Sequence, residues 1–204
     1  MTFSQIRGAL IAAFIVVSAS VAVAQTNDDR VRQMAEKLDA LMSELASRNA
    51  EQPAFLKELE EGLATIEQAD ERVAEMIEEL KKASQSMEDN SEIDNLIDEY
   101  KSQTGKLIAE AEASNNAAIK SAIPELQATL ASLETSDEKR SATVVDARNV
   151  IRALEQDKEA IAFFIRANQT SKAAELISAN VEQFGQIVAN GKEIAASLLA
   201  TINP

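Results

Sequence analysis

The stretch that decides the fold is residues 56–87, LKELEEGLATIEQADERVAEMIEELKKASQSM. Apolar side chains recur in it at alternating steps of three and four residues, and only Asp70 and Ser84 interrupt the row. This is the spacing of the a and d positions of a heptad repeat, which places one apolar seam along an α-helix. The stretch therefore predicts a long helix over residues 53–88, with Pro53 in its first turn, where its missing N–H is not needed.

The same spacing continues through most of the chain and predicts further helices on both sides of this one. These further helices cover residues 28–50, 91–134, 136–168 and 170–202. Pro124 falls inside the third predicted helix. Because proline removes a backbone hydrogen bond, we expect a kink near Pro124 or a short break at residues 121–124, but no domain boundary.

Short polar segments separate the predicted helices. Residues 89–91 are Asp-Asn-Ser, and Thr135 with Glu138 matches the capping box that starts a helix. Connections this short force consecutive helices to lie antiparallel. The sequence therefore predicts an all-α protein: an elongated antiparallel up-down helical bundle with coiled-coil packing and about five helices. Residues 25–204 are expected to form its single domain.

Residues 1–24 have the features of a secretory signal peptide. Arg7 precedes an apolar run, and Ala22 and Ala24 place small side chains where a signal peptidase requires them. We expect export, most simply to a bacterial periplasm, with cleavage after Ala24. The alternative is a membrane anchor formed by residues 9–24, although this run is shorter than the roughly 20 residues that span a hydrocarbon core.

Composition excludes many functions. The chain of 204 residues contains no His and no Cys, so imidazole- and thiolate-based catalysis, disulfides and the usual zinc and iron–sulfur sites are excluded. Its net charge of −14 argues against binding to nucleic acid. Adjacent glutamates on a helix point about 100° apart and do not converge on one substrate atom. We therefore expect no enzyme, cofactor or resident metal.

The last two predicted helices carry more apolar surface than one seam needs, and little charge. Residues 1–141 hold 27 of the 34 acidic side chains. Apolar surface with little charge, on an acidic protein, indicates a covering partner, either a second copy or another protein. The candidate partner-binding residues are Phe163, Phe164, Phe184 and Val188.

Three polar residues interrupt otherwise apolar rows: Asp70, Thr104 and Lys158. Such residues can fix the register of packed helices, line a small ligand pocket, or lie at a seam edge and reach water. The acidic turn at residues 88–94 is typical of a capped helix junction, with a calcium site as the alternative.

These observations favour an exported, non-enzymatic helical scaffold or accessory protein that acts by protein–protein contact. Two alternatives stay open. One is a periplasmic bundle that binds a small ligand between its helices. The other is a membrane-anchored coiled-coil subunit of a larger complex, which requires residues 9–24 to be retained.

Overall fold

A computed structural model describes the backbone of residues 18–202 and the side chains of residues 28–202. Every regular element in this range is an α-helix, so the predicted fold class is confirmed. The helices are α2 (Ser18–Asn49), α3 (Gln52–Glu60), α4 (Ile66–Met87), α5 (Glu92–Ala113), α6 (Ala117–Lys120), α7 (Ile123–Arg166) and α8 (Thr170–Ile202). The expected leader lies largely outside the described residues.

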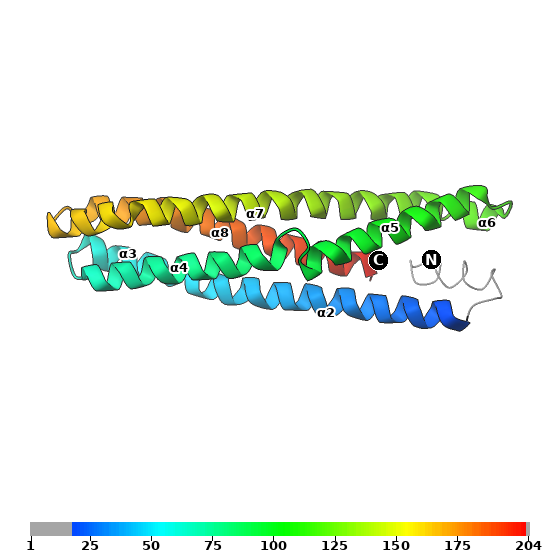
Figure 1. The fold of residues 1–204 in the computed structure, drawn as a ribbon, viewed down its shortest axis with the longest axis horizontal. Helices are drawn as coiled ribbons and strands as arrows, with labels where there is room; N and C mark the ends of the chain where they lie inside the picture. Colours follow the sequence, from blue (N-terminus) through cyan, green and yellow to red (C-terminus); the bar gives the residue numbers. More distant parts are fainter. Residues whose placement is uncertain (1–17, 203–204) are drawn as a thin grey trace.

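The helices form four antiparallel rows along one long axis (Figure 1). The first row is α2 followed by α3, and the second is α4 followed by α5. α7 and α8 each form a row alone. α8 packs against α7 on one side and against α2 and α3 on the other, while α7 also packs against α4 and α5. The prediction of an elongated up-down bundle is therefore right. The reversal between α7 and α8 lies where it was expected, whereas the other reversals lie at other positions than expected.

The prediction of one continuous helix over residues 53–88 is wrong, because the chain reverses direction at residues 61–65. Gly62 has φ +73°, which ends α3 in the left-handed conformation. The N–H of Gly62 donates to the carbonyl of Leu59, and the N–H of Leu63 donates to the carbonyl of Glu58, the paired bonds of a Schellman motif.

α4 then begins with a capping box. The Thr65 hydroxyl accepts from the N–H of Gln68 at 3.2 Å, and the Gln68 side chain accepts from the N–H of Thr65 at 2.8 Å. Leu63, placed on the seam by its spacing, lies in the turn instead and is 69% exposed.

The expected turn at residues 135–138 is also wrong, because α7 runs through it without interruption. The hydroxyls of Thr135 and Ser136 donate to the carbonyls of Ala131 and Ser132, four residues earlier in the same helix. Both hydroxyls are therefore hydrogen-bonded within α7, and a turn is not needed to give them partners.

The reversal that precedes α7 lies at residues 114–122, around the short helix α6. Pro124 occupies the first turn of α7 rather than a kink within a helix. The helices are interrupted at residues 121–122, as the expected short break requires, but the chain also reverses direction here, which was not expected. The predicted turn at residues 89–91 is present, with Ser91 capping α5. However, α5 continues in the same direction as α4, so this turn offsets one row without reversing it (Figure 1).

One continuous hydrophobic core runs between the rows. Its largest fully buried side chains include Phe184, Met42, Met76, Leu80 and Leu154. The contact between the first and second rows is more polar. Arg48 pairs with Glu79 at 2.9 Å, Arg30 pairs with Glu99 at 3.2 Å, and the Tyr100 hydroxyl donates to Asp28.

Candidate functional site: the turn end

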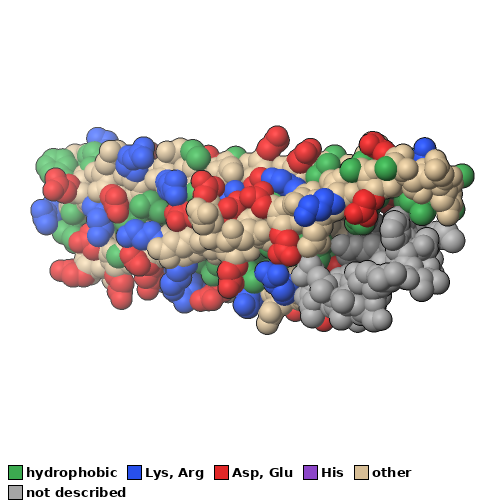
Figure 2. Space-filling view, turned by 45° about the vertical axis from the view of Figure 1, so that its right-hand side comes forward, with side chains coloured by type: hydrophobic (Ala, Val, Ile, Leu, Met, Phe, Trp, Pro, Cys, Tyr) green, Lys and Arg blue, Asp and Glu red, His purple; other side chains and the backbone are tan. Residues whose placement is uncertain are grey.

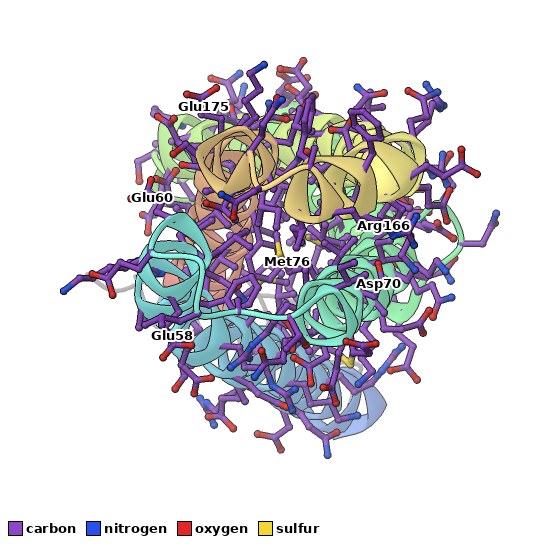
Figure 3. The ribbon with its side chains drawn as sticks, turned by 90° about the vertical axis from the view of Figure 1, so that its left-hand side faces the viewer. Glu58, Glu60, Asp70, Met76, Arg166 and Glu175 are labelled. Carbon is purple, nitrogen blue, oxygen red and sulfur yellow. The ribbon has the colours of Figure 1, made fainter. Side chains whose placement is uncertain are left out.

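The two turns at residues 61–65 and 167–169 lie at the same end of the bundle, which we call the turn end (Figure 1). The hydroxyl of Thr170, the first residue of α8, donates to the carbonyl of Glu60, the last residue of α3, at 3.1 Å. Figure 3 looks onto this end, with Met76 at its centre. Glu60 and Glu175 lie on one side of the view, and Asp70 and Arg166 lie on the other.

Both turns are built in the same way. Asn168 has φ +55° and ends α7 as Gly62 ends α3. The N–H of Asn168 donates to the carbonyl of Ile165, and the N–H of Gln169 donates to the carbonyl of Phe164. Two Schellman motifs therefore fix the backbone at this end.

The turn end exposes two large apolar side chains. Leu63 is 69% exposed and Phe163 is 61% exposed. The Phe163 ring makes an edge-on contact with Phe164 at 5.7 Å between centroids, and the Lys172 ammonium lies 5.4 Å from the Phe164 centroid. These contacts hold the Phe163–Phe164 pair in place while leaving Phe163 open to solvent.

The structure divides the four residues expected to bind a partner. Phe163 and Phe164 lie at the turn end. Phe184 and Val188 are buried in the core, and neither presents a surface for a partner. The reason is that α8 has neighbours on two sides, so the apolar surface beyond one seam is covered within the chain. Sequence reasoning missed Leu63, although Gly62 and the Thr65–Gln68 capping box both signal the turn that exposes it.

The three polar seam residues are not brought together. Asp70 is exposed near the start of α4, and Lys158 is half-buried on α7. Thr104 is 3% exposed and lies on α5, beyond the offset in the second row. No common pocket joins Asp70, Thr104 and Lys158 in the described part of the chain.

A buried arginine that the sequence reasoning did not single out anchors the middle of the bundle. Arg140 on α7 is 3% exposed. Its guanidinium donates to the carbonyl of Met87, the last residue of α4, and pairs with Asp94 at 2.5 Å and Asp137 at 2.9 Å. Arg140 therefore caps a carbonyl at the end of α4 and pairs with an acidic side chain in the first turn of α5, and so holds both helices against α7.

Further ion pairs surround Arg140. Lys101 contacts Asp137 at 2.7 Å and Asp98 at 3.0 Å. Burial raises the pKa of Asp137, but hydrogen bonds from Lys101 and Arg140 outweigh it, so this pKa lies below its ordinary value. Hydrogen bonds from Arg148 and Ser84 lower the pKa of Glu88. The acidic turn thus binds cationic side chains of its own chain.

Charge on the visible face is mixed. Figure 2 shows acidic and basic side chains interspersed along the rows, with hydrophobic side chains also reaching the surface at the turn end. Among residues 18–202, no helix has a stretch both apolar and long enough to cross a membrane. Comparison of the chain with protein-family models, curated proteins and solved structures finds no match.

Proposed function

We propose that this chain is an exported, non-enzymatic helical scaffold or accessory protein that makes its protein–protein contact through the turn end. The observation that carries the proposal is the exposure of Leu63, in the turn after α3, and of Phe163, in the last helical turn of α7, at the end where Thr170 of α8 donates to the carbonyl of Glu60 in α3. Covering apolar surface stabilises a complex by about 25 cal/mol per Å². A large exposed leucine and phenylalanine at one end are therefore suitable anchors for a partner.

The rigidity of the turn end supports the same proposal. Both turns have their helix ends satisfied by backbone hydrogen bonds, and Arg140 fixes the rows further along. A surface that is already ordered loses little conformational entropy when a partner binds. The 44 residues of α7 span about 65 Å at 1.5 Å per residue, so the bundle also separates its two ends, as a scaffold must.

One observation favours the alternative of a small-ligand-binding bundle. A cavity of about 300 Å³ lies between α2 and the α4–α5 junction. Its wall includes Met34, Leu38, Leu41 and Ile93, with Lys37 beside them. Glu92 also lines this cavity and offsets the charge of Lys37, so an uncharged apolar ligand would match this chemistry. The membrane-anchored alternative concerns residues 9–24, and its decisive test is the mass of the protein recovered from cells.

The contact proposal is tested with the double variant Leu63→Ser/Phe163→Ser. Val145→Ser is the matched control, because Val145 is 53% exposed but lies in the middle of α7. Light scattering and pull-down from an envelope extract measure association. We expect the double variant to lose a self-association or a stoichiometric partner that wild type and Val145→Ser retain. Equal association in all three proteins would contradict the turn end as the contact surface.

Export is tested separately. Intact mass of protein recovered from the periplasmic fraction is expected to begin at Gln25 or within a few residues of it. Full-length protein recovered from membranes would instead support the anchored alternative.

A further inference from the structure

A groove separates α3 from α4 next to the turn end. Its volume is about 520 Å³, and its lining residues lie within positions 51–58 on one side and 68–75 on the other. α3 packs against α8, whereas α4 packs against α7. The two walls are therefore held by different neighbours, which keeps the groove open between them.

The walls of this groove are strongly acidic. Four glutamates line it, with Arg72 as the one basic lining residue. Arg72 is shared between Glu51 at 3.6 Å and Glu75 at 3.3 Å. Glu58 and Glu71 form no ion pair within residues 28–202. The groove thus keeps negative charge that its own chain does not neutralise.

Two neighbouring apolar residues of α3 also line this groove. Phe55, which is 6% exposed, lines it together with the exposed Ala54. The turn that joins the two walls carries the exposed Leu63. A ligand that fits both features must be cationic on its flanks and apolar along one stripe.

We propose that the α3–α4 groove holds a basic amphipathic helix of a protein partner. Its lysines or arginines face Glu58 and Glu71, and its apolar stripe covers Ala54, the edge of Phe55 and Leu63. A helix satisfies its own backbone hydrogen bonds, so it can bind a groove between two helices through side chains alone. This inference rests on the proposed function and names the kind of segment that the turn end receives.

The test uses defined peptides as probes. One is an amphipathic Leu/Lys peptide of roughly 18 residues, which forms about five helical turns. The others are its Leu/Glu counterpart and a Lys/Ser peptide of equal charge without the apolar stripe. Calorimetry measures binding to the mature protein, to Glu58→Gln/Glu71→Gln, and to the matched control Glu36→Gln/Glu134→Gln. All four glutamates are exposed, so both double variants should fold.

We expect the Leu/Lys peptide to bind wild type and the control alike, and to bind the groove variant at least about tenfold more weakly. The Lys/Ser and Leu/Glu peptides should bind weakly or not at all. Equal weakening in both double variants would overturn the proposal, because it would reduce binding to general attraction by an acidic protein. If the Lys/Ser peptide bound as tightly as the Leu/Lys peptide, the proposal that the partner helix needs an apolar stripe would be wrong.

Failure here is distinguishable from failure of the proposed function. If the groove variant keeps peptide affinity while Leu63→Ser/Phe163→Ser loses its partner, the turn end is the contact surface and the groove assignment is wrong. Self-association that is lost in Glu58→Gln/Glu71→Gln would also overturn the assignment, since a second copy would then be the occupant.

Discussion

Gly191 on α8 faces Met42 on α2 so closely that a Cβ atom at Gly191 would lie 2.7 Å from the Met42 Cγ and closer still to its Sδ. Met42 is fully buried, so its side chain would have to shift among packed neighbours to make room for that atom. Because Gly191 has no side chain, α2 and α8 can approach each other as closely as they do.

Replacing Gly191 by Ala should destabilise the protein by about 1–3 kcal/mol, because an added methyl group overpacks the core. Gly105→Ala is the control, since Gly105 also lies inside a helix but has no neighbouring atom within 4 Å of the added carbon. That control should stabilise the protein by about 0.5–1 kcal/mol. Chemical denaturation measures both. A stabilising Gly191→Ala would show that α2 and α8 can move apart freely.

Gly62→Ala should cost about 1–2 kcal/mol for a different reason. No atom lies within 4 Å of the added carbon at Gly62, so the loss comes from its φ of +73° alone. Comparison with Gly105→Ala isolates this backbone effect, because both sites are sterically open. Equal unfolding free energies for the two variants would mean that the α3–α4 turn lacks the left-handed residue described above.

Arg140→Met should lower the free energy of unfolding by about 3–5 kcal/mol, because it leaves Asp94 and the Met87 carbonyl without their cationic partner, while Asp137 keeps only Lys101. Arg148→Met removes the pair with Glu88, whose two side chains are 56% and 37% exposed, and should change stability by less than about 1 kcal/mol. Urea titration of both variants tests the contrast. Losses of equal size would place Arg140 in water rather than in the bundle.

Glu79 and Asp137 should make the free energy of unfolding depend on pH in opposite directions. Burial raises the pKa of Glu79, and its attraction to Arg48 offsets only part of that rise. Ionised Glu79 therefore opposes folding at neutral pH, and wild type should gain stability relative to Glu79→Gln as pH falls through the raised folded-state pKa.

Asp137 has a lowered pKa in the folded protein, so its contribution is present above its unfolded pKa. The advantage of wild type over Asp137→Asn should disappear as pH falls through the folded-state value. Thermal unfolding of wild type and both variants between neutral and acidic pH measures the two differences. Parallel pH curves for the two variants would contradict this assignment.

The heptad spacing was sufficient to predict the fold class and the bounds of α8, because a continuous apolar stripe has few alternatives to a helix in a bundle. It could not locate the reversals. Leu63 and Ile66 continue the three-and-four spacing across a turn, so periodicity hides the break that Gly62 and Thr65 create. At this position the helix-end signals, Gly62 and the Thr65–Gln68 capping box, predict the structure better than the apolar periodicity does.

The opposite error occurred in α7. Ser136, Arg140 and Thr143 continue the row from Leu133 to Ala147, at steps of three and four. Read as seam positions, they predict an uninterrupted helix with a buried arginine, whereas the capping-box match of Thr135 with Glu138 suggested a turn. The candidate site was only partly predictable for a related reason. Sequence spacing shows that α8 has a broad apolar face but not how many neighbours cover it.

The pairing of α2 with α8 also determines the order in which the molecule can be completed during synthesis. Met42 is made about 150 residues before Gly191, the residue against which it packs. At 5–20 residues per second, roughly 7–30 s separate the two. α7 and α8 are adjacent in the chain and can form their hairpin at once, but the apolar face of α2 waits for the C-terminal helix to emerge. The first helix of the bundle to be synthesised is thus among the last to be buried, and the nascent chain carries that face uncovered for most of its synthesis.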